Sequence, residues 1–139
     1  MPLPRDSGPR LFYRVAYRRL EEAEVLFRWR FNTGSVYLAG YSIECMLKSL
    51  ILSSVPKRDQ ESTLQEFRGS RAHDFKWLWQ RYVQTSAPPL GQGTRRALLF
   101  VSTWEVDLRY NPKIGNRRDA SRFLEIVRRI VGDIDNRLG

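Results

Sequence analysis

The chain has 139 residues and a net charge of +9, from 24 Lys and Arg against 15 Asp and Glu. This length favours one domain, and 42% hydrophobic with 28% charged residues excludes a disordered or collagen-like chain. The lone cysteine, Cys45, excludes an internal disulfide, and with the lone histidine, His73, it cannot complete a Cys/His zinc site. The start of the chain has no apolar leader or lipidation motif, so we expect a soluble, cytoplasmic protein.

Helical spacing of apolar residues dominates the first third of the chain. Apolar positions recur every three or four residues over 11–31, which predicts a first helix of about twenty residues. The Asn-Thr-Gly sequence at 32–34 is suited to end this helix, and the Ser35 hydroxyl can then cap the next one. The next helix, residues 35–53, is apolar almost all round, which predicts a central position in a bundle.

The rest of the chain continues the helical pattern. The spacing predicts four further helical segments, at residues 61–68, 73–85, 94–110 and 120–138. Prolines and glycines at 87–93 separate two of them, and Asn111-Pro112 ends the fourth long helix. No segment alternates with a two-residue period, so the sequence predicts an all-α, up-and-down bundle of four to five helices. We expect one domain over residues 10–139, preceded by a flexible segment over 1–9.

Four polar-capable side chains share one edge of the second helix. Tyr37, Tyr41, Glu44 and Lys48 follow one another at steps of four, three and four residues. In one interpretation Glu44 and Lys48 pair at a partly exposed rim. In the other, Glu44 is buried and orients an arginine of a neighbouring helix through two hydrogen bonds. The two charges also argue against a membrane span, and we expect no membrane partner.

Two other sites carry polar side chains at helix ends. His73 and Asp74 begin a helix, where capping is a more common role than acid–base chemistry. Arg109, Tyr110 and Asn111 end another, where Arg109 can neutralise the helix dipole or serve a ligand.

Arginine accounts for 20 of the 24 basic residues. A phosphate-binding surface would explain this preference, because the guanidinium group offers a planar fork to phosphate oxygens. Codon bias and ion pairing within helices would also explain it. Four acidic residues precede an arginine by four positions, namely Glu24–Arg28, Glu105–Arg109, Glu125–Arg129 and Asp133–Arg137.

Common enzymatic motifs are missing from the sequence. No glycine-rich loop has the spacing of a phosphate-binding loop, which argues against Walker-type nucleotide hydrolysis. Cys45 lies inside an apolar helix, where a cysteine usually acts as a small inert hydrophobe.

The sequence Ala39-Gly40-Tyr41-x-x-Glu44-x-x-Leu47-Lys48, followed by His73-Asp74 and Arg109-Tyr110, resembles HEPN-domain proteins over about residues 11–138. The resemblance implies a helical bundle that forms a homodimer, in a toxin–antitoxin or defence context and often beside a minimal nucleotidyltransferase. Many members of that family are metal-independent ribonucleases with an arginine followed, after four to six residues, by a histidine. Arg109 matches that arginine, but the histidine positions hold Ile114, Gly115 and Asn116.

The resemblance therefore implies a homodimer that binds RNA, a nucleotide or a nucleotidyltransferase partner, with little or no ribonuclease activity. Its implied ligand-binding residues are Tyr41, Glu44, Lys48, His73, Asp74, Arg109, Tyr110 and Asn111. In this arrangement Glu44 orients Arg109 and Lys48 contacts phosphate. We expect no metal and no cofactor. Two alternatives stay open: a ribonuclease that uses His73 or Tyr110 as a substitute base beside Arg109, and a non-catalytic dimeric scaffold.

Overall fold

The computed structural model of the chain describes residues 7–110 and 116–138, with side chains described for 8–104 and 116–138. Its α-helices are α1 (Ser7–Arg28), α2 (Asn32–Ser54), α3 (Gln60–Glu66), α4 (Phe75–Val83), α5 (Gln92–Tyr110) and α6 (Arg117–Leu138). Two 3₁₀ turns, η1 (Lys57–Asp59) and η2 (Ser70–His73), flank α3. The described residues contain six α-helices and no strand, which confirms the all-α prediction, and the short α3 corresponds to the helical segment predicted at 61–68.

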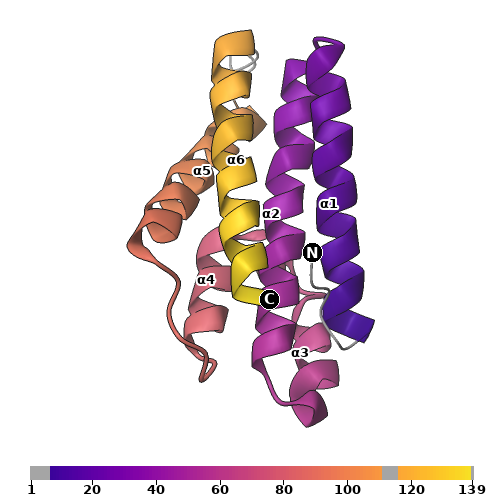
Figure 1. The fold of residues 1–139 in the computed structure, drawn as a ribbon, viewed down its shortest axis with the longest axis vertical. Helices are drawn as coiled ribbons and strands as arrows, with labels where there is room; N and C mark the ends of the chain where they lie inside the picture. Colours follow the sequence, from indigo (N-terminus) through magenta and orange to yellow (C-terminus); the bar gives the residue numbers. More distant parts are fainter. Residues whose placement is uncertain (1–6, 111–115, 139) are drawn as a thin grey trace.

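Helix α2 is the centre of the bundle, as its composition predicts. It packs against α1, α4, α5 and α6, and all residues from Ser42 to Leu52 are buried. Figure 1 shows α1, α2 and α6 side by side along the long axis, with α5 tilted on the outer side of α6 and with α3 and α4 at one end. The core therefore surrounds α2, and a polar group on α2 is exposed only along the edge that no neighbour covers.

By length and hydropathy alone, α2 could cross a membrane. However, 83% of the most apolar 18-residue stretch of α2 is buried inside the bundle. An apolar helix buried in this way is typical of the core of a soluble protein.

The turn between α1 and α2 differs from the prediction. Helix α1 ends at Arg28, before the Asn-Thr-Gly sequence, and α2 begins at Asn32. Two backbone hydrogen bonds close the end of α1, from Phe31 N to Leu26 O (2.9 Å) and from Arg30 N to Phe27 O (3.0 Å). This is the Schellman arrangement, and it places Arg30 in the left-handed region at φ 65°.

Ser35 is also not the cap that its position suggested. It lies within the first turn of α2, and its hydroxyl donates to the backbone oxygen of Ala23 at 2.6 Å. Ser35 therefore joins α2 to α1.

Replacing Arg30 by Gly is expected to raise the free energy of unfolding by about 0.5–1 kcal/mol, because glycine enters the left-handed region without steric cost. Urea denaturation measures the change. Arg28→Gly is the matched control, since Arg28 is the last residue of α1 in ordinary helical geometry and its replacement is expected to destabilise. Equal destabilisation by both variants would contradict the assigned turn.

The first helix begins earlier than predicted, because residues 7–9 form its first turn rather than part of a flexible segment. Pro9 is buried there, and its backbone oxygen accepts a hydrogen bond from the Ser49 hydroxyl at 2.7 Å. Expectations for residues 1–6 lie outside the described part of the chain.

A buried carboxylate joins α6 to α1. Asp135 is 2% exposed and accepts hydrogen bonds from the hydroxyls of Tyr13, at 3.2 Å to each oxygen, and Tyr17. The two rings also contact each other, with centroids 5.1 Å apart. Burial, and then the Asp135 charge, raise the pKa of Tyr13, and burial with the Asp135 hydrogen bond raises that of Tyr17.

Candidate functional site

The site begins with a buried ion pair on α2. Lys48 Nζ lies 2.9 Å from Glu44 Oε2, and the two side chains are only 7% and 6% exposed. Their four-residue spacing on one helix face brings them together, as the edge predicted from the sequence requires. Of the two interpretations of this edge, the ion pair is present, but it is buried rather than at a rim.

His73 completes the site from η2. Its Nδ1 lies 3.1 Å from Glu44 Oε1, so the carboxylate holds Lys48 with one oxygen and His73 with the other. The His73 side chain is 57% exposed. Because an ionised carboxylate can only accept a hydrogen bond, Nδ1 donates to Glu44, and the second ring nitrogen, Nε2, is left to serve a ligand.

Buried neighbours fix the position of His73. Ala72 on one side and Phe75 on the other belong to the core, with 0% and 3% exposure. Between them, Asp74 accepts a hydrogen bond from the backbone nitrogen of Lys76 at 2.9 Å. Asp74 therefore caps α4, which is the structural role that its position predicts. Its side chain is not part of the cluster of Glu44, Lys48 and His73, which we call the Glu44 cluster.

Two aromatic rings cover Lys48. Its ammonium group lies 5.9 Å from the ring centroid of Phe12 and 5.6 Å from that of Phe67. The rings contact each other edge to face, with centroids 5.9 Å apart. Lys48 is thus buried beneath these rings and paired with Glu44, and its expected contact with phosphate stays a prediction.

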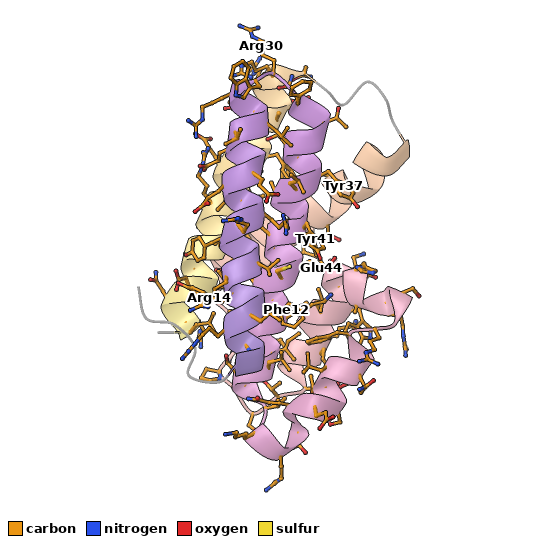
Figure 2. The ribbon with its side chains drawn as sticks, turned by 90° about the vertical axis from the view of Figure 1, so that its right-hand side faces the viewer. Phe12, Arg14, Arg30, Tyr37, Tyr41 and Glu44 are labelled. Atoms are coloured by element: carbon orange, nitrogen blue, oxygen red, sulfur yellow. The ribbon has the colours of Figure 1, made fainter. Side chains whose placement is uncertain are left out.

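The edge of α2 becomes more exposed toward the start of the helix. Tyr41 is 39% exposed and Tyr37 is 69% exposed, whereas Glu44 is 5% exposed. Figure 2 shows the three side chains in succession along α2. The Cys45 thiol, burial and the Glu44 carboxylate raise the pKa of Tyr41, so its hydroxyl is a neutral hydrogen-bonding group. We call Tyr37, Tyr41, Glu44 and His73 the α2 edge.

Cys45 lies beneath this edge and is 2% exposed. Burial, and then the Glu44 charge, raise the pKa of its thiol to about 11. We expect Cys45 to resist iodoacetamide in the folded protein and to react once urea unfolds it, because the thiolate is the reactive form. Mass spectrometry after timed alkylation measures this, and rapid labelling of the folded protein would contradict the packing of α2.

The remaining predicted residues, Arg109, Tyr110 and Asn111, fall at the end of α5. The backbone of α5 is described to Tyr110, and α5 packs against α2. The side chains of Arg109 and Tyr110, and all of Asn111, lie outside the described residues. The expected contact between Glu44 and Arg109 stays a prediction, and Glu44 already has two other partners.

The sequence did not predict that the rings of Phe12 and Phe67 lie over Lys48, or that His73 contacts Glu44. No local pattern connects Phe12 or Phe67 with Lys48, or position 44 with position 73. The exposed imidazole of His73 is therefore held by the Glu44 carboxylate, and the buried Lys48 ammonium compensates the charge of that carboxylate. Such a group can donate to or accept from a ligand oxygen. The described residues contain no group of three or more His, Cys, Asp or Glu arranged to hold a metal.

Comparison of the chain with protein-family models, curated proteins and solved structures finds no match. The resemblance to HEPN-domain proteins therefore depends on the sequence motifs.

Proposed function

We propose that this chain is a HEPN-like, cytoplasmic protein that binds RNA or a nucleotide through the α2 edge. The observation that carries the proposal is the exposed His73 ring, held at 3.1 Å by Glu44 on the edge of a central helix. A ring fixed in this way presents Nε2 to a phosphate or sugar oxygen. Tyr41 and Tyr37 extend the same edge with exposed phenol rings, on which a base can stack.

The charge of the protein supports an anionic ligand. The chain carries +9, and the ammonium of Lys48 compensates the one carboxylate in the Glu44 cluster. A phosphate approaching His73 is therefore not repelled by an uncompensated negative charge. Positive charge of this size also raises the rate of encounter with nucleic acid.

Binding is proposed ahead of catalysis because of the residues after Arg109. Cleavage through the RNA 2′-hydroxyl requires a group that takes and returns a proton near neutral pH. The positions where the resemblance implies such a histidine hold Ile114, Gly115 and Asn116. The homodimer, the toxin–antitoxin or defence context and the nucleotidyltransferase partner are further parts of the proposal, supported by the same resemblance.

Fluorescence anisotropy with a labelled single-stranded RNA tests the proposal. We expect binding that weakens with rising salt, and affinity reduced by about tenfold in His73→Ala and in Arg109→Ala, the loss typical of one charged or hydrogen-bonding contact. Arg58→Ala is the control, because its side chain is 84% exposed in η1, outside the α2 edge. Equal affinities for all four proteins would refute the proposed site.

The homodimer requires its own measurement. Sedimentation velocity at micromolar concentration is expected to show a dimer. A monomer at that concentration would remove the dimer from the proposal and leave the α2 edge of a single chain as the binding surface.

A metal-independent ribonuclease is the second candidate. The Glu44–His73 contact favours it, because a carboxylate at Nδ1 fixes the tautomer in which Nε2 can take a proton. Robust cleavage of RNA in EDTA that is lost in His73→Ala, and absent for a 2′-deoxy substrate, would replace binding by this function. We expect little or no cleavage.

A further inference from the structure

A cleft in the surface lies between α4 and α5, outside the α2 edge. Its volume is about 250 Å³, just below the range of roughly 300–1,000 Å³ usual for small-molecule pockets, so a ligand would be only partly enclosed. Phe75 and Leu98, which are 3% and 5% exposed, form its apolar base. Leu99 lies at its border and is 59% exposed. The cleft is therefore a shaped apolar surface open to solvent.

An aromatic ring forms one wall of the cleft. Trp79 lines it from α4, and the guanidinium carbon of Arg95 on α5 lies 5.1 Å from the Trp79 ring centroid. Another planar group can take the place of the guanidinium on this ring. A displaced Arg95 would then be available to pair with a negative charge on the same ligand.

The polar groups of the cleft select the chemistry of that ligand. Among the described residues that line it, the ionisable ones are Lys76 and Arg95, and both are cationic. Gln80 and Ser102 add neutral groups that can both donate and accept hydrogen bonds. The cleft thus offers a stacking surface, hydrogen bonds for the edge of a polar ring, and two positive charges for an anion.

We propose that this cleft binds one nucleotide, with the base stacked on Trp79 and the phosphate paired with Arg95 and Lys76. The nucleotide can be a free mononucleotide or one nucleotide of an RNA strand, since both present the same base and phosphate. The cleft shares no residue with the α2 edge, so it can bind its ligand whether or not the α2 edge binds RNA.

Isothermal titration calorimetry with adenosine 5′-monophosphate tests the proposal. Binding is expected to weaken by about tenfold in Trp79→Leu and in Arg95→Gln, in line with the loss of one base-stacking or phosphate contact. Trp79→Phe keeps an aromatic ring and is expected to retain most of the affinity. Trp29→Leu is the control, because Trp29 is 74% exposed in the α1–α2 turn. Adenosine and ribose 5-phosphate, which lack the phosphate or the base, are expected to bind more weakly than the mononucleotide.

A short oligoadenylate RNA, titrated into the same variants, distinguishes the two sources of the nucleotide. Mononucleotide binding that depends on Trp79 and Arg95 assigns the cleft to a free nucleotide. RNA binding that depends on them, without mononucleotide binding, assigns it to one nucleotide of a strand. Dependence of neither ligand on Trp79 and Arg95 would overturn the proposal. RNA binding that is lost in His73→Ala but kept in Trp79→Leu, together with mononucleotide binding that does not depend on Trp79, would refute the cleft alone. RNA binding that is lost in Trp79→Leu but kept in His73→Ala would refute the α2 edge alone.

Discussion

Replacing Glu44 by Ala is expected to lower the free energy of unfolding by about 3–5 kcal/mol, the usual cost of leaving a buried charge without its partner. The Lys48 ammonium would remain beneath Phe12 and Phe67, where the rings compensate only part of its lost ion pair. Urea denaturation with an unchanged m-value would show that the loss is one of stability alone.

A double-mutant cycle separates the ion pair from its surroundings. The single variants Glu44→Leu and Lys48→Met are both expected to destabilise, because each leaves the other charge buried without its ion-pair partner. The double variant Glu44→Leu/Lys48→Met removes both charges and is expected to recover most of the loss, since apolar groups of similar volume can replace a buried pair. Additive losses in the double variant would show that the two charges act independently, which contradicts the 2.9 Å contact.

The double variant Tyr13→Phe/Tyr17→Phe is expected to lower the free energy of unfolding by about 3 kcal/mol, because it removes two phenol hydrogen bonds to a buried carboxylate, each worth about 1.5 kcal/mol or more. The rings stay in place, so the change reports the hydroxyl groups. Tyr37→Phe is the control: this side chain is 69% exposed, and its loss of a hydroxyl is expected to change little. A loss in the double variant as small as that in the control would contradict the role given to Asp135.

The same contact gives the stability a dependence on alkaline pH. The raised pKa of Tyr17 means that the folded protein retains the phenol proton at a pH where the unfolded chain has released it. Stability from this group is therefore present below the unfolded pKa of about 10 and falls as the pH rises above it. Cys45 also has a raised pKa, so the comparison is made between Cys45→Ala and Cys45→Ala/Tyr17→Phe. Urea denaturation between neutral pH and about pH 11 is expected to show a smaller decline in the free energy of unfolding for the variant that lacks the Tyr17 hydroxyl.

The sequence predicted the helices and the central position of α2 because both depend on local spacing of apolar residues. It also predicted that Glu44 and Lys48 share an edge and that Asp74 starts a helix, since each involves residues within four positions. It did not predict the left-handed residue Arg30 after the end of α1, because glycine and asparagine are favoured there and an arginine in the left-handed region carries no sequence signal.

The contacts that the sequence could not predict join residues far apart in the chain. His73 meets Glu44 across 29 positions, and Tyr13 meets Asp135 across 122. Local charge patterns were also a poor guide to partners. Glu24, four residues before Arg28, instead pairs with Arg128 of α6 at 2.6 Å. These pairings follow from the packing of helices, which periodicity alone does not determine.

The most direct test of the central claim uses the fact that His73 is the only histidine in the chain. Its ring carbon–hydrogen signals in a ¹H–¹³C NMR spectrum can therefore be assigned without ambiguity. Titration with single-stranded RNA is expected to shift these signals and saturate together with binding, because Nε2 faces the ligand. RNA that binds and shifts other signals while the His73 ring signals stay unchanged would contradict the α2 edge as the binding site.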